Sequence, residues 1–178
     1  MTNRKNTTLK LTYSAMCLAM AMLLPFLTAN NMQLGNALSL MHIPVFLCGF
    51  LCGAPWGAAV GLIAPMLRHL IIGMPPFWTA FAMMFELCAY GFLSGLFYKI
   101  FPKKIPFIYV SLVLAMLGGR IVGGAVKFIL MGLGKTTFSF AAFFTSYFVV
   151  AWPGILVHIV LVPLLIIALK KAKLTLND

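Results

Sequence analysis

Six apolar segments, separated by short polar or glycine- and proline-rich stretches, run through this sequence. A helix that crosses a bilayer needs roughly 20 apolar residues, so six of them leave almost nothing of a 178-residue chain for a separate aqueous domain. Only 8% of the residues are charged, against about 25% in soluble domains. The sequence therefore predicts an all-α integral membrane protein, a single membrane domain over residues 1–178 with six transmembrane helices. The predicted spans cover residues 11–28, 38–52, 56–72, 78–98, 107–131 and 147–169.

Positive charge gathers in the stretches that a six-span arrangement places on one side of the membrane. The chain carries 13 Lys and Arg against two acids. Nine of these cations precede the first span, join the fourth to the fifth, or follow the sixth: Arg4, Lys5, Lys10, Lys99, Lys103, Lys104, Lys170, Lys171 and Lys173. Because cytoplasmic loops of membrane proteins collect Lys and Arg, we expect both termini to be cytoplasmic.

Four ionisable residues lie inside the apolar segments or near their ends: Arg68, Glu86, Arg120 and Lys127. A charge at the bilayer centre costs about 2.5–3.5 kcal/mol on insertion scales, so such residues need partners. With cytoplasmic termini, all four fall in the outer half of the bundle. Arg120 and Lys127 are seven residues apart and share one helix face. The four side chains are therefore predicted to converge.

Three cations against one acid leave positive charge that Glu86 cannot neutralise. Guanidinium and ammonium groups bind carboxylates and phosphates through charge-assisted hydrogen bonds, so the surplus favours a small anionic ligand. The alternative is a structural ion pair between Glu86 and Arg68 or Arg120, with Lys127 extending to the membrane interface. Both interpretations stay open on the sequence alone.

Further residues complete the candidate substrate site. His69 and His158 offer additional hydrogen-bond donors near the four ionisable groups. Trp152 suits ligand stacking, but it equally suits the aromatic belt of a membrane interface. His158 equally suits a hydrogen-bonded interior position. The full candidate set is Arg68, His69, Glu86, Arg120, Lys127, Trp152, His158 and Asn36, the last of these in an amide-rich loop over residues 28–36.

Catalytic and metal chemistry finds little support in this sequence. Glu86 is the only acid before Asp178, so neither a pair of catalytic carboxylates nor a carboxylate-bound metal site can be built. Residues 132–136 resemble the end of a phosphate-binding loop, but Ile129 stands where that loop requires its first glycine. We expect no catalytic residues, no metal and no cofactor, and therefore no enzyme.

Glycines recur at intervals of four residues in several segments. This spacing lets the backbones of membrane helices approach closely, so it predicts tightly packed helix pairs. The glycines concerned are Gly49, Gly53, Gly57 and Gly61, then Gly91 with Gly95, and Gly119 with Gly123.

The stretch from Leu38 to Val45, LSLMHIPV, followed by Gly49, the run GAPWG over residues 53–57 and Gly61, resembles the second and third helices of the substrate-binding S components of energy-coupling factor (ECF) transporters. The length, the six predicted spans and the loop after the first span are also similar to that family. Ala15 and Ala19 match the AxxxA spacing by which family members dock their membrane-embedded coupling subunit.

This resemblance implies a multi-pass subunit of a prokaryotic cell membrane that captures a vitamin or related micronutrient and has no ATPase activity of its own. The implied partners are the transmembrane coupling subunit, two cytoplasmic ATPase subunits and the membrane lipids, with no nucleic acid. The cationic surplus favours an acidic vitamin, such as pantothenate or a folate-like compound, over thiamine. Two alternatives remain: a membrane-embedded enzyme acting on a lipid or isoprenoid, and an assembly protein that binds no small ligand.

Overall fold

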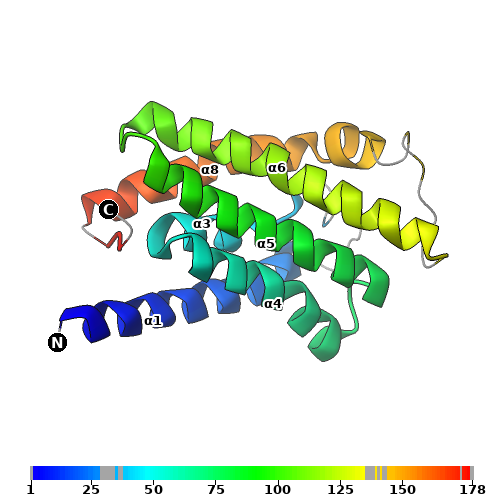
Figure 1. The fold of residues 1–178 in the computed structure, drawn as a ribbon, viewed down its shortest axis with the longest axis horizontal. Coiled ribbons are helices and arrows are strands. Elements are labelled where there is room, and N and C mark those ends of the chain that lie inside the picture. The colour runs from blue at the N-terminus through cyan, green and yellow to red at the C-terminus, as the bar shows by residue number, and fades with distance from the viewer. Residues whose placement is uncertain are drawn as a thin grey trace.

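The computed structural model describes residues 2–28, 35, 38–134, 139, 141, 144–172 and 174–176. Within these residues the chain is all-helical and contains no strand, which confirms the predicted fold class (Figure 1). The elements are α1 (Thr2–Leu23), its 3-10 continuation η1 (Leu24–Thr28), α3 (His42–Cys52), α4 (Ala54–Ile72), α5 (Phe77–Ile100), α6 (Ile105–Gly132), the π-helix η2 (Thr145–Val150) and α8 (Trp152–Lys171).

Five helices in the described part of the chain are long and apolar enough to cross a membrane. They are Asn6–Leu27, α4, α5, α6 and α8, and each leaves large apolar side chains exposed on its outer surface, as lipid contact requires. The sixth apolar helix, α3, has 11 residues and is therefore only about 16 Å long, well short of a bilayer core of about 30 Å.

Helix α3 begins at His42, four residues into the apolar run at 38–52. Pro44 supplies the physical reason, because proline has no N–H and is tolerated in the first turn of a helix but not in its interior. Ser39, with φ of 47°, and the turn at residues 40–41 lead the chain into the helix. The His42 amide donates to the Ser39 carbonyl at 3.0 Å and closes this entrance.

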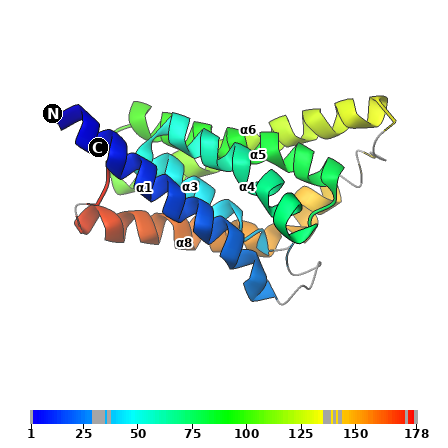
Figure 2. The same ribbon diagram turned by 90° about the horizontal axis from the view of Figure 1, so that it is seen from below.

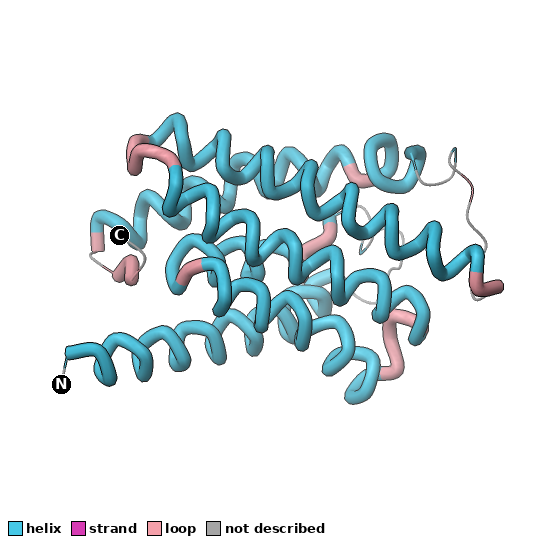
Figure 3. Tube along the Cα trace, in the orientation of Figure 1, coloured by secondary structure: helices cyan, strands magenta, loops and turns pink. Residues whose placement is uncertain are grey.

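Helix α3 forms the centre of the bundle, in contact with α1, α4, α5 and α8 (Figures 1 and 2). Every residue from Ile43 to Cys52 is buried, as expected for a short helix that is apolar on all sides. Helix α5 packs against α3, α4 and α6. Short loops join the consecutive helices from α3 to α6 (Figure 3). The shortest is Gly53 alone, whose φ of 100° favours glycine.

Glycines bring α3, α4 and α5 into backbone contact. A Cβ added at Gly57 would collide with the Gly91 carbonyl, and one at Gly91 would collide with the Gly57 carbonyl. Gly49 faces Gly91 and Ser94 in the same way, and Gly61 faces the Leu87 carbonyl. Small residues allow this close approach because they have little or no side chain. The three helices therefore form a rigid, glycine-packed unit.

The two ends of the bundle differ in what they contain. Helix α1 begins and helix α8 ends at the same end (Figures 1 and 2). The loop between α5 and α6 lies there too, because Lys170 Nζ donates to the Lys103 carbonyl at 3.2 Å. The turn between α3 and α4 is nearby, since the Leu176 amide donates to the Leu51 carbonyl at 3.0 Å. This end, which we call the closed end, carries the described loop cations.

Candidate functional site

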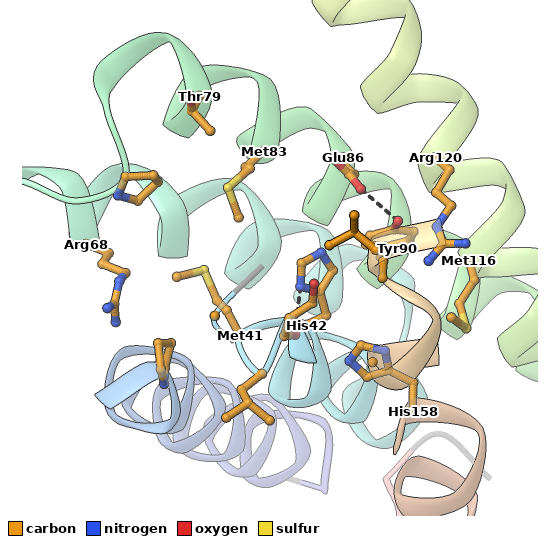
Figure 4. A pocket seen from close by; sticks show the side chains of 18 of the residues that line it. Met41, His42, Arg68, Thr79, Met83, Glu86, Tyr90, Met116, Arg120 and His158 are labelled. Carbon is orange, nitrogen blue, oxygen red and sulfur yellow. Dashed lines mark hydrogen bonds between the residues drawn. The ribbon is translucent and has the colours of Figure 1, made fainter. Parts of the chain in front are cut away.

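A cavity of about 660 Å³ opens at the other end of the bundle, within the size range of small-molecule sites, about 300–1,000 Å³. Its walls come from η1, the turn before α3 and the start of that helix, the end of α4, the loop that joins α4 to α5, the end of η2, and the facing sides of α5, α6 and α8. Residues far apart in the sequence thus meet around one chamber (Figure 4). We call this the cavity end.

Five of the eight predicted site residues line the cavity: Arg68, Glu86, Arg120, Lys127 and His158. His69 does not line it, and its Nδ1 instead lies 2.8 Å from the Pro75 carbonyl while its ring contacts Phe77. Trp152 is also outside the lining, with 59% of its surface exposed. Asn36 lies outside the described residues.

Glu86 is held in place on α5 by hydrogen bonding and by the absence of a side chain opposite it. Glu86 is 4% exposed, and its Oε1 accepts a hydrogen bond of 2.8 Å from Tyr90 Oη. A Cβ at Gly123 on α6 would lie 2.7 Å from Oε2, so that glycine provides the space for the carboxylate. Gly119, one turn earlier, likewise leaves room for the Tyr90 ring.

The spacing of Gly119 and Gly123 predicted a close approach of two backbones. Instead, these two glycines of α6 accommodate side chains of α5. The difference arises because α5 presents the large residues Tyr90 and Glu86 to α6, whereas it presents Gly91 and Gly95 to α3 and α4. Spacing alone identifies the small face of a helix but not what fills the space opposite.

Arg120 and Lys127 project from α6 into the same cavity wall as Glu86. Lys127 lies within electrostatic range of the Glu86 carboxylate, and Arg120 lies within range of His42 and His158. Figure 4 shows the Arg120 guanidinium beside Tyr90 and Glu86, above Met116. The two α6 cations and the one carboxylate thus form a single charged wall.

Arg68 occupies the opposite edge of the cavity (Figure 4). Its Nη1 donates to the Met22 carbonyl at 3.1 Å, and its guanidinium carbon lies 5.3 Å from the centroid of the Phe26 ring. Arg68 therefore fastens α4 to the end of α1 and η1. The pairing of Arg68 with Glu86 that the sequence left open is replaced by these contacts.

Two residues that the sequence analysis missed, His42 and Tyr90, also line the cavity. His42 Nδ1 lies 2.9 Å from the Ser39 carbonyl, and because a carbonyl can only accept, this nitrogen carries the proton. The His42 ring centroid lies 5.3 Å from that of Tyr90 and 5.9 Å from that of His158. The usable signals were the position of His42 within the LSLMHIPV stretch, two residues before Pro44, and the spacing of Tyr90 four residues after Glu86.

His158 is buried at the floor of this cluster, with 3% of its surface exposed. Its Nε2 has no hydrogen-bond partner among the described residues. Buried polar groups are hydrogen-bonded in the great majority of cases. Methionines 41, 83 and 116 supply the apolar part of the lining around the histidines, and their flexible thioethers adapt to the shape of a bound molecule.

A bundle of membrane-capable helices around an open chamber, lined by cations and by hydrogen-bonding rings, defines a class of protein that binds a small polar molecule. The family comparison makes this more specific. Residues 9–168 match the family described as ECF transporter, substrate-specific component. The chain belongs to that family, and the resemblance seen in the sequence is confirmed. No curated protein and no solved structure matches the chain.

Membership establishes the general role of the chain. It is a multi-pass protein of the cell membrane and a substrate-specific subunit of an ECF transporter. Such subunits bind the transported substrate and work with a membrane coupling subunit and ATPases. The family is a transport component and not a group of enzymes.

Proposed function

We propose that this subunit captures an acidic, water-soluble vitamin or related micronutrient, with pantothenate or a folate-like compound favoured, from outside the cell for ATP-driven uptake. The observation that carries the proposal is the charge of the cavity. Among the residues described, three cationic side chains and one carboxylate line it. An anionic ligand would supply the missing negative charge.

The arrangement of the cations supports binding of the ligand's acid group at the part of the cavity lined by Arg120 and Lys127 of α6, which we call the α6 wall. Arg68 already donates to the Met22 carbonyl at the opposite edge. Arg120 and Lys127 both line the cavity from α6, and Lys127 lies within electrostatic range of Glu86. One carboxylate cannot balance both cations, and the low polarity of the surroundings strengthens the attraction for a second anion. The proposed contacts of the ligand's acid group are therefore Arg120 and Lys127.

The position of the cavity supports capture from outside. The described loop cations gather at the closed end, where α1 begins and α8 ends (Figure 1). Cationic loops stay on the cytoplasmic side. With the closed end in the cytoplasm, the cavity end faces the exterior and receives the vitamin there.

The exposed face of α1 supports a docking role for Ala15 and Ala19, the two residues whose spacing resembles the family's docking motif. Both are exposed, and Met16 and Met20 beside them are 58% and 39% exposed. Small side chains on a lipid-facing helix allow a partner helix to approach closely. We expect the double variant Ala15→Leu/Ala19→Leu to lose co-purification with the coupling subunit and its two ATPases while keeping vitamin binding. Unchanged co-purification would contradict this docking role.

Isothermal titration of the purified chain in detergent, without nucleotide, tests the proposed ligand class. Pantothenate and folate represent the acids, and thiamine is the positively charged comparison. We expect an acid to bind and thiamine not to bind. Arg120→Ala and Lys127→Ala should each weaken acid binding by about 10- to 100-fold, because a hydrogen bond to a charged group contributes about 1.5–3 kcal/mol.

Lys104→Ala is the matched control, since Lys104 is an exposed cation at the closed end. It should leave acid binding unchanged. Tight binding of thiamine with no binding of either acid would contradict the proposed ligand class. Acid binding that survives both Arg120→Ala and Lys127→Ala would contradict the proposed contacts.

A further inference from the structure

We infer that His158 Nε2 is a specificity-determining contact to the ligand, and that the ligand carries a neutral hydrogen-bonding group, a hydroxyl or an amide, in addition to its acid group. This inference rests on the proposed function and narrows its substrate class to hydroxy or amido acids. Simple apolar acids are excluded from that class.

The first observation is the uncompensated burial of Nε2. His158 is 3% exposed, and Nε2 makes no hydrogen bond within the described part of the chain. An unsatisfied buried polar atom costs about 1–3 kcal/mol. The same imidazole forms part of the cavity lining, next to His42 (Figure 4). Nε2 itself has almost no accessible surface without a ligand, so a ligand that fills the cavity supplies the missing partner through a small shift of this ring.

The second observation is that the ring is held on two sides. The Phe46 ring lies edge-on to it, with centroids 5.8 Å apart. The His42 ring lies at 5.9 Å on another side and is itself anchored through Nδ1 to the Ser39 carbonyl. Phe46 is buried, and His42 is half-buried and fixed by its contact with the Ser39 carbonyl. The Ser39 backbone also lies near the His158 ring, yet Nε2 makes no hydrogen bond among the described residues. These neighbours hold the His158 ring at the wall of the cavity.

The surroundings of His158 indicate the chemistry of the group that meets it. Arg120 lines the same cavity and lies within electrostatic range of both histidines. A neutral imidazole offers one donor and one acceptor nitrogen. A hydroxyl can both donate and accept, and an amide presents one N–H and one carbonyl, so either group satisfies Nε2 in either tautomer. A second carboxylate would only be able to accept.

Two variants separate hydrogen bonding from packing. His158→Phe keeps an aromatic ring between Phe46 and His42 but removes Nε2. His158→Gln keeps a hydrogen-bonding amide close to the position of Nε2. Thermal unfolding in detergent is measured for the full chain and both variants, without ligand and with pantothenate or folate, and isothermal titration gives the affinities.

We expect ligand-free His158→Phe to unfold at a higher temperature than the natural chain, by about 2–6 °C, because it removes a buried unsatisfied atom. Its affinity for the vitamin should fall by about 10-fold or more. His158→Gln should retain most of the affinity. A packing role alone would not produce a variant that is more stable without ligand and weaker in binding.

Different results count against different claims. If neither acid binds the natural chain, the proposed function fails and this inference falls with it. If an acid binds but His158→Phe binds it equally well, the proposed function stands and the His158 contact is wrong. If ligand-free His158→Phe unfolds at a lower temperature than the natural chain, Nε2 is already satisfied and the inference is overturned.

Discussion

The closed end and the cavity end of this bundle are built from similar helices, but they differ in whether their buried polar groups find hydrogen-bond partners within the chain. At the closed end, backbones of α3, α4 and α5 touch through glycines, and the fully buried Ser94 hydroxyl donates to the Gly91 carbonyl at 3.1 Å. At the cavity end, residues from seven helical elements surround an open chamber and His158 Nε2 is left without a partner in the described structure. The buried Ser94 hydroxyl is satisfied by the chain itself, whereas we propose that His158 Nε2 is satisfied by a ligand.

Glycine has a different purpose at each end. In the α3, α4 and α5 unit it removes side chains so that backbones meet, whereas in α6 it makes space for Tyr90 and Glu86. The same substitution, glycine to alanine, should therefore impair stability in one region and ligand binding in the other. This difference can be measured directly.

The largest effect is expected for Gly91→Ala, within the glycine-packed unit. Its new Cβ would collide with the Gly57 carbonyl, and a backbone atom cannot move aside unless the two helices separate. We expect a loss of unfolding free energy of about 3 kcal/mol, the upper part of the usual range for overpacking. Thermal unfolding in detergent checks it.

Gly132→Ala is the matched control for this prediction. A Cβ there meets nothing within 4 Å, and alanine favours the helix by about 1 kcal/mol relative to glycine. The variant should be as stable as the natural chain or slightly more so. Equal losses in Gly91→Ala and Gly132→Ala would show that the close contact at Gly57 is not what stabilises the unit.

A smaller effect on stability, but a clear effect on binding, is expected for Gly123→Ala. The added Cβ would displace the Glu86 carboxylate, whose Oε2 lies within 2.7 Å of its position, towards the cavity, where it would repel an anion. Acid binding should weaken by about 10-fold, equivalent to about 1.4 kcal/mol. Titration of Gly123→Ala and of Gly123→Ala/Glu86→Gln tests the cause. The double variant should recover affinity, and failure to recover would contradict repulsion as the reason.

The smallest effect is expected for Tyr90→Phe, which removes the 2.8 Å hydrogen bond to Glu86 Oε1. The freed carboxylate should then compete better with the ligand for Lys127. A hydrogen bond to a charged acceptor contributes about 1.5–3 kcal/mol. Only part of this free energy would pass into the competition with the ligand, so acid affinity should fall by about 2- to 10-fold in the same titration. Tyr98→Phe is the control, since Tyr98 packs against Phe50 and near Lys103 at the closed end. An equal change in both variants would argue against a role specific to the cavity.

Patterns that depend only on composition and order were readable from the sequence. Apolar length predicted helices that could cross a membrane, and the LSLMHIPV stretch with its following glycines indicated the family. The placement of charged residues within apolar segments pointed to five residues that do line one cavity: Arg68, Glu86, Arg120, Lys127 and His158. The inferences about spans and charged residues use the cost of polar groups in a lipid environment, and the family inference uses residue order alone. Neither depends on how the helices are oriented.

Features that depend on helix rotation and on backbone carbonyls could not be read in this way. Arg68 faces the Met22 carbonyl, 46 positions away in the chain, and nothing in the sequence identifies a backbone oxygen as a partner. His42 becomes a cavity residue because Pro44 and the turn before it set where α3 begins. His69 and Trp152 share the chemistry of site residues, but their helix positions leave them outside the lining.

The central claim is that the cations of the α6 wall bind a ligand's negative charge. The most direct test is to titrate the full chain with the acidic vitamin that binds it and with the same vitamin carrying an amide in place of its carboxylate. The account predicts that the neutral form binds at least about 100-fold more weakly, a difference of about 2.7 kcal/mol, and that Arg120→Ala largely abolishes this difference. Equal affinities for the acid and its amide would contradict it.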